Sequence, residues 1–443
     1  MKKKILILFV FLIIFSSFTV VNADIGSVKV THIKETKKQI LSGNKEWTFM
    51  VYIAADDAQI QSSVYHQHRG KINMLSYCKS NEDYNWVYEI DTLDKFSGSK
   101  RYYVGDTVEL KENLSEQSTG KSENLINFVS WAKTNFPAEK YCLIIYGHGS
   151  GWRDLLCVDS TNNNDVINMD ELKTSMDGIK SVLGKKLDLL IMESCFMGMI
   201  EVYYQLRDNV DICIGSEDLM INWGLQYKLA LNVLNNNPTA DAVTLAGYFL
   251  NRSADYYQGS GLKLTYAIVD VDKATSTLTQ AIDNFAQSLN NKFSSYKKQI
   301  KKAISATKRY DSSYNGDKYI LHFYDLFDFA DNIQTRISDP NIFSKAQQVK
   351  DAIFESIHFE RHYCSSGNGI SIYLPTFKLK FPYEPTYENL DFSEDTQWDE
   401  FVKNTKNLVL INSVSSTILN SQSYIIFKNL YSVFSMKTQC LLS

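Results

Sequence analysis

The stretch "YCLIIYGHGSGW", Tyr141 to Trp152, is an apolar run that stops at a glycine-rich turn. Its apolar part has the continuous character of a strand buried on both faces of a parallel sheet. The turn places His148 between two glycines, and side-chain packing alone gives no reason for a histidine at this position. "LDLLIMESC", Leu187 to Cys195, is built in the same way and ends in an acid, a serine and a cysteine. The two stretches predict two buried strands that each end in residues capable of chemistry.

Strand-like and helix-like segments alternate on both sides of these two stretches. "WTFMVYIAA" opens the series at Trp47, helical spacing of apolar residues follows from Ser122 to Phe136 and from Met169 to Leu183, and "VDICIGS" is a further strand. Such alternation favours right-handed crossovers between parallel strands. We therefore predict an α/β fold with a mostly parallel central sheet flanked by helices.

The chain is expected to divide into five parts. Residues 1–23 form a targeting segment, 24–45 a polar lead-in or pro-segment, 46–270 the main α/β domain, 271–404 a helical and strand region packed on it, and 405–443 a tail without clear periodicity. Within the fourth part, Lys273 to Lys308 is expected to form one long amphipathic helix, and "KYILHFYDLFDFADNI" is also expected to be helical.

The first residues have the pattern of a secretory signal peptide. Three lysines precede an apolar run from Ile5 to Phe15, and Val21-Asn22-Ala23 fits a cleavage site. The run is shorter than the roughly 20 residues that span a bilayer, so cleavage is favoured over anchoring. The mature protein is expected to be secreted, with no stable membrane insertion.

The composition narrows the classes of partner. The 443 residues are 44% apolar and 22% charged, with a net charge of −4 whose signs are interspersed, so a nucleic-acid-binding surface is not predicted. The seven cysteines lack the spacing of zinc ligands. An odd number of cysteines in a secreted chain indicates a free thiol. His66 and His68, in "YHQHRG", lack the acidic partners of a metal site.

His148 and Cys195 are candidates for a catalytic pair, because the carboxyl ends of parallel strands are where ligands bind. A thiolate is the reactive form of cysteine, and an imidazole or a following helix N-terminus lowers its pKa. The N–H groups of Gly149 and Cys195 are candidates for an oxyanion hole. Taken singly, a cysteine is more often a buried core residue and a histidine a turn residue. Their occurrence together favours catalysis.

These motifs resemble the clostripain family of cysteine peptidases, which has a caspase-like fold. The same resemblance extends to "WTFMVYIAADD", "GSGW", "CFMGMIEV", "IGSED", "YDLFDFA", "GISIYLP" and "WDEFV", and covers Glu46 to Lys403. It implies that 46–270 is a catalytic domain that hydrolyses peptide bonds through a thioester on Cys195, with His148 as general acid and base. Protein or peptide substrates, a monomeric state and no cofactor for the chemistry are expected.

The resemblance also implies cleavage after Arg or Lys, read by acids in the substrate pocket. Glu193 matches the family's acidic position, and its side chain is expected on the same strand face as Cys195. Asn222 and Trp223 stand where basic-specific relatives carry another acid and a glycine-rich turn. Glu217 or Asp218 is the expected substitute.

Calcium and self-processing are further implications of the resemblance. The run "DSTNNND", Asp159 to Asp165, offers oxygen donors for calcium but lacks the spacing of a known calcium loop. Relatives often cut their own chain between the catalytic histidine and cysteine, yet no Lys or Arg occurs from Asp154 to Leu172. We expect either no processing or processing at one of the flanking basic residues, which are Arg153, Lys173, Lys180, Lys185 and Lys186.

Two other functions stay open at this point. One is a catalytically silent caspase-like module that binds peptides, against which the joint presence of His148, Gly149 and Cys195 argues. The other is a cysteine hydrolase or transpeptidase that acts on cell-wall peptides with the same nucleophile.

Overall fold

The computed structural model describes residues 44–56, 60, 78–93, 98–153, 156–220, 224–260, 264–314, 317–363, 367–375 and 387–406. The expected signal peptide, most of the lead-in, the "YHQHRG" segment and all but the first two residues of the tail lie outside the described residues. So do Asn222 and Trp223.

A nine-stranded sheet forms the centre of the molecule, with the strand order β13-β10-β9-β8-β5-β1-β2-β3-β4. Its central strands run parallel: β9 (Val210–Ser216), β8 (Leu187–Glu193), β5 (Ala138–Tyr146), β1 (Lys45–Ala55) and β2 (Tyr84–Thr92). The predicted parallel α/β sheet is confirmed in this central part.

Antiparallel strands close both edges of the sheet. They are β3 (Lys100–Val104) and β4 (Val108–Asn113) at one edge, and β10 (Leu264–Asp270) and β13 (Ile357–Tyr363) at the other. β13 comes from residues 271–404, the region expected to pack on the main domain from outside. The central sheet therefore includes a strand from beyond residue 270.

Each face of the sheet carries its own layer of helices. Met50 and Tyr52 of β1 belong to the core beneath α3 (Ser122–Asn135), α4 (Met169–Leu183) and α5 (Ile200–Leu206). Phe49 and Val51 belong to the opposite core beneath α6 (Tyr227–Leu234) and α7 (Ala242–Tyr257). This alternation follows from the two-residue period of a strand and explains why β1 is apolar without interruption.

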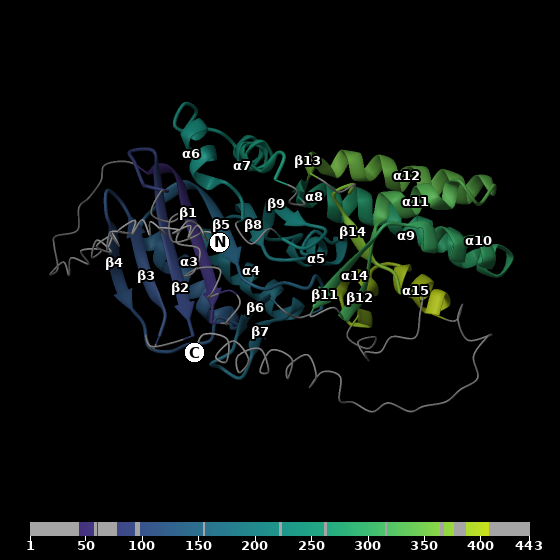
Figure 1. Ribbon diagram of the computed structural model, residues 1–443, viewed down its shortest axis with the longest axis horizontal. Helices are drawn as coiled ribbons and strands as arrows, with labels where there is room; N and C mark the ends of the chain where they lie inside the picture. Colours follow the sequence, from purple (N-terminus) through teal and green to yellow (C-terminus); the bar gives the residue numbers. More distant parts are fainter. Residues whose placement is uncertain are drawn as a thin grey trace, which may run out of the picture.

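The C-terminal region adds helices and a small sheet, drawn on the right of Figure 1. The helical elements are α8 (Val271–Lys273), η1 (Ala274–Leu278), α9 (Thr279–Asn291), α10 (Phe293–Ala306), α11 (Leu326–Gln334), α12 (Pro340–Ser356), α14 (Asp391–Glu394) and α15 (Trp398–Lys406). The small sheet pairs β11 (Arg309–Tyr314), β12 (Asp317–Asp325) and β14 (Ser371–Tyr373). Side chains from α9, α11, α12 and α15 share one apolar core with the main sheet.

Two sequence predictions for this region are wrong. The stretch from Lys273 to Lys308 is not one helix, because a π-helical turn interrupts it and Lys292, at φ −115° and ψ 10°, separates α9 from α10. "KYILHFYDLFDFADNI" begins as β12 and turns helical only at Leu326. Among the described residues, no helix combines the length and the apolar character needed to cross a membrane.

Candidate active site

The two motif strands are neighbours in the sheet. β5 and β8 pair in parallel with Tyr146 opposite Glu193, and the N–H of Gly147 donates to the carbonyl of Glu193 at 3.4 Å. His148 and Cys195 each follow two residues after the end of their strand. The topology therefore brings both residues to the same edge of the sheet.

Gly149 packs directly against the backbone of the cysteine turn. A Cβ at Gly149 would lie 2.7 Å from the carbonyl oxygen of Cys195, 2.8 Å from the Cβ of Ser194 and 3.1 Å from the backbone nitrogen of Cys195. Real Cβ atoms essentially never show the first two distances, and the third is tight, so the backbone would have to shift to admit any residue but glycine. The close approach also places the Gly149 backbone beside the Cys195 N–H, as two oxyanion-hole donors require.

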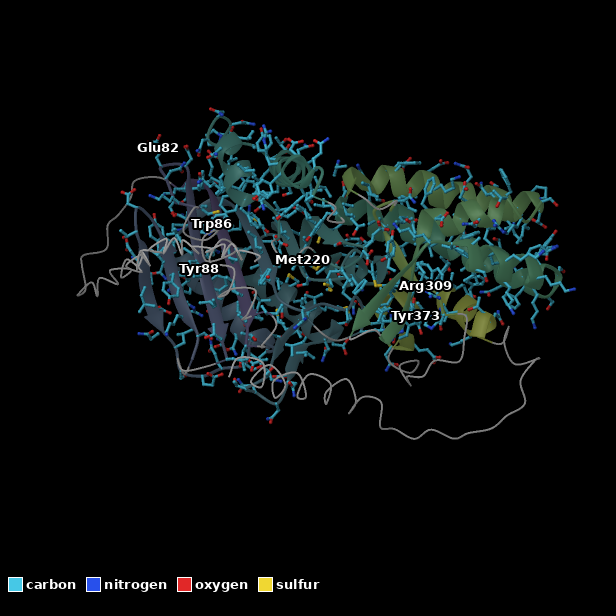
Figure 2. The ribbon with its side chains drawn as sticks, in the orientation of Figure 1. Glu82, Trp86, Tyr88, Met220, Arg309 and Tyr373 are labelled. Carbon is cyan, nitrogen blue, oxygen red and sulfur yellow. The ribbon has the colours of Figure 1, made fainter. Side chains whose placement is uncertain are left out.

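Cys195 is partly exposed, whereas the other described cysteines, Cys78, Cys142, Cys157 and Cys213, are buried. The N–H of Met220 donates to its Sγ at 3.3 Å. Figure 2 shows Met220 at the middle of the view, between the large sheet and the C-terminal helices. Burial raises the pKa of the Cys195 thiol to about 11, the Met220 N–H acts to lower it, and Asp218 raises it. At neutral pH the resting group is a thiol, which needs a base to become a nucleophile.

The turn after Cys195 is fixed to the end of β9. Phe196 adopts a left-handed backbone with φ 62°, and its N–H donates to the carbonyl of Asp218 at 3.1 Å. The N–H of Gly198 donates to the carbonyl of Ser216 at 2.8 Å. Helix α5 begins only at Ile200. The expectation that a helix N-terminus directly lowers the pKa of the thiol is therefore wrong.

The loop that carries His148 is held on two sides. His148 itself is partly buried, and its carbonyl accepts a 3.4 Å hydrogen bond from the N–H of Cys157, at the start of a hairpin of β6 (Leu156–Asp159) and β7 (Asp165–Ile167). On the other side, the ring of Trp152 contacts Tyr373 at 4.8 Å between centroids. The "GSGW" motif thus ties the histidine loop to the small C-terminal sheet.

Arg153 stands out among the predicted processing positions because it is buried. Its Nη2 donates to the carbonyl of Leu321 at 3.0 Å, and its guanidinium lies 5.3 Å from the ring centroid of Trp152. A protease that binds a basic side chain would have to displace these contacts to reach Arg153. Lys173 and Lys180 lie within α4, so a cut at either would have to open a helix.

Glu193 lies in a fully buried setting rather than at an open pocket wall. Its Oε1 accepts hydrogen bonds of 2.8 Å from the N–H of Leu225 and from the hydroxyl of Tyr227, and its Oε2 accepts one of 3.4 Å from Tyr266. The charges of Glu193 and Cys195 both raise the pKa of Tyr266, after burial. The acid and the thiol therefore both lie near Tyr266, and the expectation that they share a strand face stays a prediction because Cys195 lies beyond the end of β8.

Glu217 and Asp218 have different roles although they are adjacent. Glu217 is fully buried, and its Oε2 accepts a 2.9 Å hydrogen bond from the N–H of Gly369 in the C-terminal region. Burial and the nearby Asp325 raise its pKa well above the usual range. The prediction that Glu217 binds substrate is therefore not supported by its position, which is structural. Asp218 keeps accessible surface and acts electrostatically on Cys195.

Sequence reasoning missed one group of polar residues at the same edge of the sheet. Oxygen atoms of Asp56, Asp91, Glu116 and Asp159 all lie within 4.8 Å of one another. Asp56 directly follows β1 and Asp91 lies at the end of β2. The rule that drew attention to His148 and Cys195, polar residues at the ends of apolar strands, would have found both acids.

Comparisons with known proteins identify the relatives of this chain. The sequence profile of the clostripain family matches residues 51–407. Clostripain from Hathewaya histolytica is 23% identical, over 78% of this chain and 78% of that protein.

Solved structures show the same fold. One is a secreted C11 cysteine protease from Bacteroides thetaiotaomicron in complex with an irreversible peptide inhibitor, at 18% identity and a TM-score of 0.59, covering 80% of this chain and 100% of that one. Another is an inactive zymogen C11 protease from Parabacteroides distasonis, at 17% identity and a TM-score of 0.61, covering 81% and 99%. With its predicted caspase-like α/β fold confirmed, the chain belongs to the clostripain family of cysteine peptidases.

Proposed function

We propose that this protein is a secreted endopeptidase that cleaves after Arg or Lys with a dyad of Cys195 and His148. The observation that carries the proposal is the packing of the Gly149 backbone on Cys195, the one partly exposed thiol among the described cysteines. This packing brings the histidine loop, the nucleophile and two candidate oxyanion donors to one place. The N-terminal signal pattern and a relative described as secreted support the secretion.

The chemistry follows from the state of the thiol. Because the pKa of Cys195 is raised to about 11, His148 has to take its proton as substrate binds. The thiolate then attacks the scissile carbonyl, and the N–H groups of Gly149 and Cys195 stabilise the negative charge on its oxygen. His148 returns the proton to the leaving amine, which leaves a thioester on Cys195. Water activated by His148 hydrolyses the thioester and restores the thiol.

The preference for a basic residue before the scissile bond is assigned to Asp218 and Glu193. Asp218 is accessible and close enough to Cys195 to affect its pKa. Glu193 is a buried acid near the thiol, held by Tyr227 and Tyr266. Hydrogen bonds between a guanidinium or ammonium group and a carboxylate are among the strongest that proteins make, so the accessible carboxylate of Asp218 favours Arg and Lys, while Glu193 lies buried behind it.

The test is hydrolysis of fluorogenic peptides with Arg, Lys, Asn, Asp or Leu before the scissile bond, under reducing conditions with and without calcium. We expect cleavage after Arg and Lys that Cys195→Ala abolishes. Cys213→Ala is the matched control, because this cysteine is buried in β9 and has no part in the mechanism. Cleavage only after another residue would overturn the basic preference. Equal activity of Cys195→Ala would overturn the dyad.

A further inference from the structure

Two hydroxyl side chains lie beside the turn that faces Cys195. Ser216 is the last residue of β9, Thr265 is the second residue of β10, and both are buried. β9 and β10 pair antiparallel with Tyr266 opposite Ser216, so the start of β10 lies next to the end of β9. The oxygens of Ser216 and Thr265 are 2.9 Å apart. We call these two residues the hydroxyl pair.

The hydroxyl pair holds both backbone groups of Asp218. The N–H of Asp218 donates to Oγ1 of Thr265 at 3.2 Å, and Oγ of Ser216 donates to the carbonyl of Asp218 at 3.1 Å. A serine hydroxyl has one hydrogen, and that of Ser216 goes to this carbonyl, so the Thr265 hydroxyl is the donor between the two oxygens. The peptide groups of Asp218 and the two hydroxyls therefore form a closed ring of hydrogen bonds.

This ring fixes the turn around Cys195 at two points. The carbonyl of Asp218 also accepts the 3.1 Å hydrogen bond from the N–H of Phe196, the residue after Cys195. The side chain of Asp218 accepts from the N–H of Leu219 at 2.8 Å, which directs the chain towards Met220. The N–H of Met220 then donates to the Sγ of Cys195 at 3.3 Å. The position of Asp218 thus decides where this N–H points.

We propose that Thr265 is a positioning residue for the nucleophile: together with Ser216, its hydroxyl keeps the Met220 N–H directed at the sulfur of Cys195. The inference rests on the proposed function of Cys195. A hydrogen bond strengthens when its acceptor becomes ionised, so the Met220 N–H stabilises the thiolate more than the thiol. In agreement, this N–H lowers the pKa of Cys195, against burial and Asp218, which raise it. Thr265 acts through the backbone of the turn and not on the substrate.

The titratable groups around the thiol come from the ends of β5 and β8, from the turn after β9 and from β10. Within the described part of the chain they are Tyr146, His148, Glu193, Asp218 and Tyr266. Replacing Thr265 by another uncharged residue alters none of these charges. A change in the reactivity of Cys195 would therefore report the hydrogen bond from Met220.

The experiment compares Thr265→Val with the wild type. Valine keeps the shape of threonine but removes the acceptor of the Asp218 N–H and the donor to Ser216. The first measurement is the rate at which iodoacetamide alkylates Cys195 between pH 7 and pH 10, followed by mass spectrometry of the peptide that contains Cys195. We expect alkylation to be about tenfold slower at each pH, because less of the reactive thiolate is present.

The second measurement is hydrolysis of the fluorogenic peptides. We expect kcat to fall by about tenfold while KM stays within about twofold, because the hydroxyl pair supports the nucleophile and does not bind the substrate. Thr265→Ser restores the hydroxyl, and both its alkylation rates and its kcat should stay within about twofold of wild type.

Thr48→Val is the matched control. This threonine is also buried in a strand of the main sheet, and its hydroxyl donates to the carbonyl of Phe136 at 2.6 Å. It pairs with Tyr141 near the start of β5, whereas the site follows the end of that strand. Thr48→Val should therefore unfold at a lower temperature than wild type but keep its alkylation rates.

If Thr265→Val does not fold, Ser216→Ala replaces it, since it removes the other hydroxyl and should also slow alkylation. Alkylation as fast as in wild type, or faster, would overturn the proposal, because a turn that only loosened would expose the sulfur. Equal losses in Thr265→Ser and Thr265→Val would also overturn it, since the hydroxyl would then not be the group that matters. Alkylation does not require peptidase activity. Failure of the wild type to cleave any peptide would therefore overturn the proposed function but leave this test intact.

Discussion

The active site and the carboxylate group of Asp56, Asp91, Glu116 and Asp159 occupy the same edge of one sheet, but the chain builds them by different means. At the ends of β5 and β8, backbone meets backbone: Gly149 packs on the Cys195 turn so closely that no side chain fits between them. At the ends of β1 and β2, side chains meet instead, and their charges oppose assembly. The addition of a methyl group should therefore inactivate the active site, whereas the carboxylate group should be sensitive to the loss of a charge.

Gly149→Ala is expected to have the largest effect. Its Cβ would push against the Cys195 backbone and displace an oxyanion donor, so kcat/KM should fall by about 10²–10³-fold. Peptide hydrolysis by the purified variant measures the fall. Gly247→Ala, in α7 with nothing near its Cβ position, is the control and should retain full activity. Activity of Gly149→Ala close to that of wild type would contradict the close packing.

Asp159→Asn tests whether the hairpin β6–β7 positions the His148 loop, and its effect should be smaller. The carboxylate of Asp159 accepts 2.8 Å hydrogen bonds from the N–H groups of Thr119 and Asn162, and the N–H of Cys157 in the same hairpin donates to the carbonyl of His148. An amide has one acceptor oxygen fewer, so one of these bonds is lost and kcat/KM should fall severalfold. Peptide hydrolysis measures the fall, with Asp165→Asn as the neighbour that should keep wild-type activity. Wild-type activity of Asp159→Asn would show that the hairpin does not position His148.

Asp218→Asn tests the charge beside the thiol. Because Asp218 raises the pKa of Cys195, its removal should increase the thiolate fraction at pH 8, and alkylation by iodoacetamide should be a few-fold faster. The preference for Arg and Lys over Leu should fall about tenfold, since one carboxylate is lost from the pocket. Mass spectrometry of the alkylated peptide and the fluorogenic panel give the two readouts. Faster alkylation with an unchanged preference for Arg and Lys would mean that Asp218 affects the thiol but does not bind the basic side chain of the substrate.

The sequence was sufficient to predict the site where reactive side chains directly follow apolar strands. Apolar runs that end in His148 and Cys195 identified two buried strands and their shared edge, because parallel strands place their carboxyl ends together. The antiparallel edge strand β13 was missed, since nothing in its local sequence tells which distant strand it pairs with. The enclosure of Glu217 was missed for a similar reason: its partner Gly369 is 152 residues away, so only the folded chain shows that its carboxylate is buried.

Glu217→Gln should have the smallest effect, and it should concern stability rather than catalysis. Burial raises the pKa of Glu217 above its value of about 4.5 in an unfolded chain. Below that pH both states are protonated and folding carries no penalty; as pH rises above it, the unfolded chain releases a proton that the folded protein retains, so the wild type loses stability. Gln imitates the protonated acid, and Gly369 can still donate to its carbonyl.

The difference in unfolding temperature between Glu217→Gln and wild type should therefore be close to zero at pH 4 and should grow in favour of the variant by pH 8. Thermal unfolding across this pH range measures it, in the Cys195→Ala background to prevent self-cleavage. Burial also raises the pKa of Asp325, whose charge acts on Glu217, so Asp325→Asn serves as the partner variant and should show a trend of the same sign. A Glu217→Gln variant that is less stable at every pH would mean that the charged form is the one the fold requires. In that case Glu217 would again be a candidate for binding a cationic substrate group, as the sequence first suggested.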